Sequence, residues 1–244
     1  MLTAAFYVSN HGYGHASRVC ALAEALGNWG VFCHIITDRP AFLFKTLAPH
    51  LHCLHPRRVD FGVIHKDNLQ VDLEATKSEI IRIMNRRNRI MATEVDFIRQ
   101  HGVNFIISDA SYLAAEIAVY AKVPCYLVSN FDWYYIYAGL FAADSSMRPV
   151  LNTIRGLYQL MDMAFRLPFS TKASMNSCPR LIKTGVLARL LPEQAESLPE
   201  LDIPDGSRIL LVMFGGEGAM KLDFEKLSAS FPGIVISTKQ GVKA

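Results

Sequence analysis

The sequence has few cysteines, and their spacing fits neither a disulfide framework nor a metal site. Five cysteines occur in 244 residues, and no two form a Cys-x-x-Cys pair. Most of them lie in apolar runs, where a thiol behaves as a small hydrophobic group. An odd number of scattered cysteines is typical of a chain kept reduced in the cytoplasm, so we expect a cytoplasmic protein without disulfides.

Long apolar runs and a strong net charge are also lacking. No apolar stretch approaches the about 20 residues of a membrane span, and the N-terminus has no basic region typical of a signal peptide. The formal net charge is only +3, which does not favour nucleic acid as a partner. Motifs of the HExxH and GxSxG type are absent, so we expect no metal and no serine-hydrolase site.

Short β-branched runs alternate with helical patterns along a chain that is 51% hydrophobic. The alternation predicts an α/β fold, a doubly wound parallel sheet of the Rossmann-like type. The expected strands are 3–9, 31–37, 51–55, 103–109, 124–130 and 180–187. The expected helices are 15–29, 72–100, 112–121, 131–143 and 150–162.

The amino-acid composition changes between residues 188 and 207, where three prolines and five acidic residues interrupt the hydrophobic periodicity. We therefore predict a first domain over 1–190, a linker over 191–207 and a strand-turn-helix unit over 208–244. A unit below about 40 residues does not bury a core by itself. Either the chain is a truncated two-domain protein, which we favour, or the second unit adds strands to the first sheet.

The stretch "SNHGYGHASR" (9–18) carries the clearest functional pattern. It places His11, Gly12, Gly14 and His15 where the first strand ends and a helix begins. Ligands of open parallel sheets bind at this edge, and glycines let the backbone approach them. We expect His11, Gly12 and Gly14 to shape a binding pocket and His15 to point into it.

His15 is a candidate general base. The positive end of a helix favours a neutral imidazole, the form that accepts a proton from a sugar hydroxyl. The alternative is that His11 and His15 only hydrogen-bond the local backbone. Two histidines interleaved with glycines at a strand end favour the functional interpretation.

A dinucleotide-binding fingerprint is a weaker interpretation of the same stretch. Gly12-x-Gly14-x-x-Ser17 is close to GxGxxG, and Asp38 ends the second strand where a ribose-binding acid would lie. However, Ser17 replaces the third glycine, and the two imidazoles occupy the space that a pyrophosphate needs.

Three motifs together resemble a family of GT-B-type glycosyltransferase-like proteins. "YVSNHGYGHASR" (7–18) resembles the YxSGHGxGHxxR signature of that family, which includes the N-terminal domain of plant L-arabinokinases. It is more distantly similar to the glycine-rich turn of the MurG and MGDG-synthase glycosyltransferases. "SNFDWYYIY" (129–137) resembles the family's SNFSWDWIY, and "FGGEG" (214–218) resembles the loop that opens the donor domain.

The sequence departs from these motifs at four positions. Asn10 replaces a glycine of the signature. Asp132, Tyr134 and Tyr135 replace serine, aspartate and tryptophan in the second motif. These departures bear on which acceptor the protein would take rather than on its fold.

Further candidate residues follow from strand ends and from the resemblance. Asp109 ends a strand and would orient His15, as in related plant enzymes, or else cap the next helix. Asn130 and Trp133 follow another strand end and are candidate sugar contacts. The donor diphosphate would meet the backbone of the loop glycines Gly215, Gly216 and Gly218.

The resemblance implies a glycosyltransferase that moves a sugar from a nucleotide sugar to an acceptor hydroxyl. The expected donor is a UDP-sugar. No metal or other cofactor is implied, because such enzymes hold the diphosphate with backbone and side-chain donors. The acceptor would be a sugar, a lipid or a small molecule. The arginines of the 72–100 helix could bind a membrane surface peripherally, or they could simply form a solvated face of the helix. Two other functions stay open: a non-catalytic sugar- or nucleotide-binding module, or half of a split enzyme completed by a partner subunit; and a GT-B-fold nucleotide-sugar epimerase.

Overall fold

The computed structural model describes residues 1–67, 70–189, 208–212, 223–232, 234–238 and 241–243. The chain forms two compact units. The larger comprises Met1–Ile64 and Val71–Arg189, and the smaller comprises His65–Gln70 and Leu190–Ala244. The expected linker at 191–207 lies outside the described residues.

The larger unit is built on a seven-stranded sheet in the order β3-β2-β1-β4-β5-β6-β7, with every pair of neighbours parallel. The strands are β1 (Thr3–Val8), β2 (Phe32–Thr37), β3 (His52–Pro56), β4 (Phe105–Asp109), β5 (Cys125–Ser129), β6 (Met163–Arg166) and β7 (Leu181–Lys183). The expected α/β, Rossmann-like fold is confirmed.

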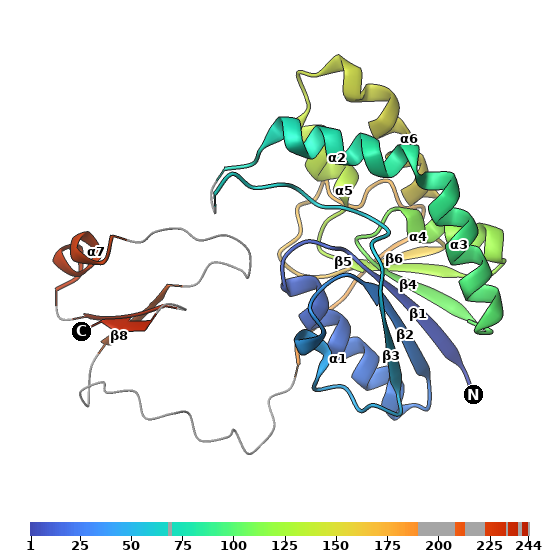
Figure 1. The fold of residues 1–244 in the computed structure, drawn as a ribbon, viewed down its shortest axis with the longest axis horizontal. Coiled ribbons are helices and arrows are strands. Elements are labelled where there is room, and N and C mark those ends of the chain that lie inside the picture. Colours follow the sequence, from blue (N-terminus) through green and yellow to red (C-terminus); the bar gives the residue numbers. More distant parts are fainter. Residues whose placement is uncertain (68–69, 190–207, 213–222, 233, 239–240, 244) are drawn as a thin grey trace. The chain divides into compact units, whose positions relative to one another are not determined.

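Helices cover both faces of this sheet (Figure 1). On one face lie α1 (Gly14–Asn28) and the short 3-10 helix η1 (Ala41–Phe44). The other face carries α2 (Leu73–Asn85), α3 (Arg87–Gln100), α4 (Leu113–Ala121), α5 (Trp133–Leu140), the 3-10 turn η2 (Ser145–Met147) and α6 (Arg148–Gln159). Strands in the interior of the sheet, such as β1, are therefore apolar on both sides.

Strand β1 shows how the two faces share one run of residues. Ala5 and Tyr7 belong to the core beneath α3 and α4, whereas Ala4, Phe6 and Val8 belong to the core beneath α1. All five are buried because β1 lies in the interior of the sheet, between β2 and β4. The carboxyl end of β1, where the His11–His15 stretch begins, is thereby fixed next to the end of β4.

The expected single helix over 72–100 is wrong, because the chain forms two helices that meet at Arg86. The segment 85–89 reads NRRNR and offers no apolar side chain to continue the buried stripe, so the helix can turn there. Arg87 then pairs with the carboxylate of Glu116, which joins α3 to α4.

Two further boundaries differ from the prediction. The strand expected at 180–187 is confined to Leu181–Lys183, and the four-residue strand β6 was not predicted at all. Both are short strands towards the β7 edge of the sheet, where periodicity over three or four residues carries little information.

The smaller unit contains β8 (Arg208–Val212), α7 (Phe224–Ser230), β9 (Ile234–Thr238) and β10 (Gly241–Lys243). Strands β8 and β9 are parallel, and β10 runs antiparallel to β9. They form a separate three-stranded sheet. The alternative in which this unit extends the first sheet is therefore wrong.

Candidate functional site

The site is assembled where β1 and β4 end side by side. In the register of the two strands Val8 lies opposite Asp109, and the amide of Ser9 donates to the carbonyl of Asp109 at 3.1 Å. The following residue, Ala110, adopts a left-handed φ of 61°, which costs a non-glycine residue about 1 kcal/mol. Such strain is common at functional sites.

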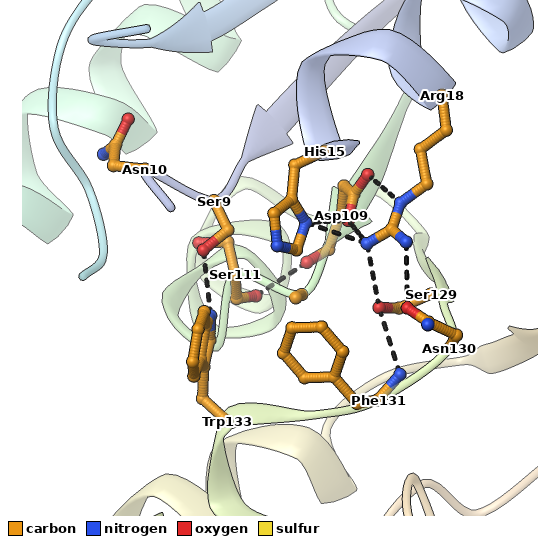
Figure 2. Close-up of polar contacts among 12 residues, drawn as sticks. Ser9, Asn10, His15, Arg18, Asp109, Ser111, Ser129, Asn130, Phe131 and Trp133 are labelled. Atoms are coloured by element: carbon orange, nitrogen blue, oxygen red, sulfur yellow. Dashed lines mark hydrogen bonds and ion pairs between the residues drawn. The ribbon is translucent and has the colours of Figure 1, made fainter. Parts of the chain in front are cut away.

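His15 and Asp109 meet at this edge. Nδ1 of His15, in the first turn of α1, lies 2.7 Å from Oδ1 of Asp109, and the residues are 5% and 2% exposed. The other ring nitrogen points away from Asp109, towards the side where Ser9 and Trp133 lie (Figure 2). Helix α4 begins without a side-chain cap, so of the two roles predicted for Asp109 the structure shows the contact with His15.

Arg18 joins the pair, and the sequence analysis did not single it out as a site residue. Its Nε donates to Oδ2 of Asp109 at 2.6 Å, and its Nη2 donates to Oδ1 at 2.5 Å (Figure 2). Nη2 also lies 2.8 Å from Nδ1 of His15. Arg18 is the last residue of the 7–18 motif and follows His15 by three positions, which places both on the same face of α1.

The charges of the site are tightly paired. Burial opposes the ionised form of Asp109, but the adjacent Arg18 and the hydrogen bonds from Arg18 and His15 outweigh burial and hold the pKa of Asp109 below its usual range. Burial likewise opposes the charge of Arg18, and Asp109 outweighs it and raises the pKa of the guanidinium. Asp109 and Arg18 therefore form a permanent ion pair at neutral pH.

Asn130 belongs to the same network. Its Oδ1 accepts a hydrogen bond from Nη1 of Arg18 at 2.9 Å, and Nη2 of Arg18 also reaches Oγ of Ser129 at 3.3 Å. The ends of β4 and β5 are thus joined through one guanidinium. Substrate contact by Asn130 stays a prediction.

Trp133 is a buried wall of the site, only 1% exposed. Its Nε1 donates to Oγ of Ser9 at 2.9 Å, and its ring stacks on Tyr137 with centroids 5.4 Å apart. The His11 ring meets it edge-on at 5.3 Å. These contacts make Trp133 a residue that positions the first turn, and its predicted contact with a sugar stays a prediction.

The position of His11 depends on Gly62, which the sequence analysis did not single out. A Cβ atom at Gly62 would lie 2.5 Å from Cβ of His11, closer than real contacts allow. The hydroxyl of Tyr137 donates to the carbonyl of Gly62 at 2.9 Å and so holds this backbone in place. Gly12 has a φ of +60°, which explains the need for glycine there, whereas Gly14 is the first residue of α1.

Two departures from the family motifs have structural roles. Oδ1 of Asn10 accepts from the hydroxyl of Thr37 at 2.9 Å and from the amide of Asp38 at 2.8 Å, which ties the ends of β1 and β2 together. Asp132 caps α5 by accepting from the amide of Tyr135 at 2.7 Å, and it also accepts from the amide of Met175.

A cleft of about 460 Å³ adjoins the His15–Asp109 pair. It is lined by Gly14, Ser17, Arg18 and Asn130 together with parts of the 167–169 and 186–189 segments. Two of the predicted binding residues, Gly14 and Asn130, therefore border open space, while His11, His15 and Trp133 lie outside its lining.

Other predicted positions do not join this cluster. Asp38, the acid of the dinucleotide alternative, accepts from Nε of Arg58 at 2.6 Å and pairs with Arg39 at 3.3 Å. Gly215, Gly216 and Gly218 lie outside the described residues. Among the residues that are described, none of the helices is long and apolar enough to cross a membrane.

Solved structures similar to this chain include glycosyltransferases. The kitacinnamycin glycotransferase matches 97% of this chain with a TM-score of 0.62 at 13% identity, and this chain covers 65% of it. The calicheamicin glycosyltransferase CalG4 matches 97% with a TM-score of 0.59 at 13% identity, over 66% of its length. UGT2 of Phytolacca americana, solved with UDP-2-fluoroglucose and pterostilbene, matches 93% with a TM-score of 0.56 at 14% identity, over 62% of its length. The seven-stranded unit has the fold of a Rossmann-like GT-B domain.

A relative is also found by sequence. The chain is 29% identical over 226 residues to L-arabinokinase of Arabidopsis thaliana; the match covers 88% of this chain and 21% of that protein. This chain therefore spans about a fifth of its length. No protein-family model matches the chain. The resemblance to GT-B-type proteins and to L-arabinokinase is confirmed.

Proposed function

We propose that this chain forms the acceptor-side half of a GT-B glycosyltransferase that moves a sugar from a nucleotide sugar to an acceptor hydroxyl. The observation that carries the proposal is the buried contact of 2.7 Å between His15 and Asp109 at the carboxyl edge of the sheet. It is supported by the GT-B fold, by a neighbour solved with a UDP-sugar analogue and by a relative named for an activity on a sugar.

The geometry suits His15 as the general base. With Nδ1 turned towards Asp109, Nε2 accepts the proton of the acceptor hydroxyl as that oxygen attacks the anomeric carbon of the donor sugar. The bond between the anomeric carbon and the phosphate oxygen breaks, and the nucleoside diphosphate leaves with its electron pair. Asp109 holds the ring and stabilises the imidazolium that forms.

Arg18 supports a second candidate function, a sugar- or nucleotide-binding module without turnover. The guanidinium already balances the charge of Asp109 and lies 2.8 Å from Nδ1 of His15. Less of the carboxylate's charge is then left to stabilise an imidazolium. In this alternative, Arg18 and Asn130 bind the ligand at the adjoining cleft.

Activity assays on the protein as its native cell produces it distinguish the two functions. The protein is incubated with a panel of UDP-sugars and sugar, lipid or small-molecule acceptors, and release of UDP is measured. We expect turnover with at least one pair, and His15→Gln to lower it by about 100- to 10,000-fold, the usual contribution of a general base.

The matched control is His50→Gln, because His50 is an exposed histidine outside the site. Turnover that survives His15→Gln would refute the base assignment. Binding of a UDP-sugar without UDP release from any acceptor would establish the binding module. An epimerised donor in the absence of acceptor would instead identify an epimerase.

A further inference from the structure

A second cluster of chemically active side chains lies on strands β2 and β3. His34 pairs in register with Cys53, and parallel partners in register project to the same face of a sheet. His55 follows Cys53 by two positions and shares that face. Each side chain offers one ligand atom, and these atoms all lie within 4.8 Å of one another.

The cluster differs from the His15 site in place and in exposure. His34 is 6% exposed, His55 is half-buried and Cys53 is exposed, so the cluster opens to solvent on one side. The ring of His101 lies 4.7 Å from that of His34. His101 is the C-cap residue that follows α3. The cluster therefore lies on β2 and β3 beside the C-terminal end of α3, whereas His15 lies where β1 and β4 end.

We propose that His34, Cys53 and His55 form a binding site for a divalent zinc ion. A thiolate and two imidazoles are the ligand types that zinc prefers in proteins, and three protein ligands leave a fourth position for water. Nδ1 of His34 lies 2.9 Å from Nε2 of His55, so in the metal-free protein one ring nitrogen donates to the other. Zinc would replace that hydrogen bond.

The distances require little rearrangement. Zinc–nitrogen and zinc–sulfur bonds of about 2.0–2.3 Å in a tetrahedron place ligand atoms about 3.3–3.7 Å apart. The present atoms lie within 4.8 Å of one another. The largest adjustment is therefore about 1 Å, and the exposed side chain of Cys53 can supply it by rotating.

The surroundings hold the ligands and balance the nearby charge. Phe97 packs edge-on against the rings of His34 and His55, at 5.4 and 4.7 Å between centroids. The guanidinium of Arg57 lies over Phe97 and pairs with Glu94 at 3.1 Å. This cation is compensated by the carboxylate and therefore repels a metal ion less than an unpaired arginine would.

Metal titration of the complete protein tests the proposal. The protein is stripped with a chelator and titrated with Co²⁺, whose complex with a thiolate absorbs by charge transfer from sulfur, and then with Zn²⁺. We expect one equivalent of Co²⁺ to bind with this absorption and Zn²⁺ to displace it. Cys53→Ser and His55→Gln should each weaken Zn²⁺ binding by about 100-fold or more, with His50→Gln as the matched control.

A measurement on the unchanged protein guards against misfolding of the variants. Of the five cysteines only Cys53 is exposed, so its alkylation by iodoacetamide reports the thiol directly. Saturating Zn²⁺ should slow this reaction by at least about tenfold, because metal-bound thiolate is withdrawn from reaction. Unchanged alkylation, or Zn²⁺ binding that Cys53→Ser leaves intact, would overturn the proposal.

Discussion

Asp60 shows what a single buried carboxylate does at the residue scale. It lies against the segment that joins β1 to α1 and is only 1% exposed. Its Oδ1 accepts a hydrogen bond from the amide of Asn10 at 3.2 Å. Burial raises its pKa to about 6 against the opposing effect of that hydrogen bond. A raised carboxyl pKa means that the folded protein binds more protons than the unfolded chain between about pH 4 and 6, so this group lowers stability as pH rises through that range.

We therefore expect the stability of Asp60→Asn, relative to the unchanged protein, to be greater at neutral than at acidic pH. The unfolding free energy of the variant minus that of the unchanged protein should rise by about 2 kcal/mol from pH 4.5 to pH 7.5. Urea unfolding at both values measures it, and Asp96→Asn on the exposed face of α3 reports the effect of losing a surface charge. An equal effect of Asp60→Asn at both values would contradict the expectation.

Whether a residue of the site could be predicted from the sequence depends on how far along the chain its partners lie. The place of His11, Gly12 and His15 after the first strand could be predicted because they share one short motif there. Gly62 could not, because its role is to leave room for His11, which lies 51 positions earlier and meets it only in the folded chain. Arg18 was visible in the motif, but its purpose depends on Asp109, 91 positions away.

At the scale of elements, the entry into α1 rests on two glycines with different requirements. Gly12 has a φ of +60°, so a side chain there is strained whatever space surrounds it, whereas a Cβ at Gly14 meets no atom within 4 Å. We expect Gly12→Ala to destabilise the protein by about 1–2 kcal/mol. Gly14→Ala should be neutral or stabilising by up to about 1 kcal/mol, because alanine favours a helix.

Urea unfolding of the two variants measures this difference, and each is the control for the other. Equal losses of unfolding free energy would show that the strand-to-helix turn is not what selects glycine at residue 12. The two variants should also differ in function. Gly12→Ala strains the turn before α1 and is expected to displace His15 from Asp109, whereas Gly14→Ala is not.

The helices and strands themselves were largely predictable, and the errors have a common cause. Periodicity located β1, α1, β2 and β4 to within one or two residues. It joined α2 to α3 because apolar residues recur on both sides of Arg86, and only the pairing of Arg87 with Glu116 shows where the chain turns. Short strands such as β6 gain their stability from their neighbours rather than from their own pattern.

At the scale of the whole molecule, the larger unit holds the complete seven-stranded sheet and both hydrophobic cores. We expect a fragment of residues 1–189 to fold cooperatively on its own, because each face of its sheet is covered within that range. Thermal unfolding followed by circular dichroism measures it. A broad transition without a defined midpoint, or an unfolded fragment, would show that residues beyond 189 are required.

Sequence alone was enough to predict the alternation of strands and helices, the glycine- and histidine-containing turn at the end of the first strand, and the resemblance to GT-B-type proteins. Local periodicity and turn chemistry carry this information, because burial of one face and the φ angles of a turn are properties of neighbouring residues. Which distant groups meet became clear only from the folded chain. The strand order β3-β2-β1-β4-β5 brings Asp109 to His15 across 94 positions and Cys53 to His34 across neighbouring strands. Such contacts depend on how strands pair, and no single segment encodes that pairing.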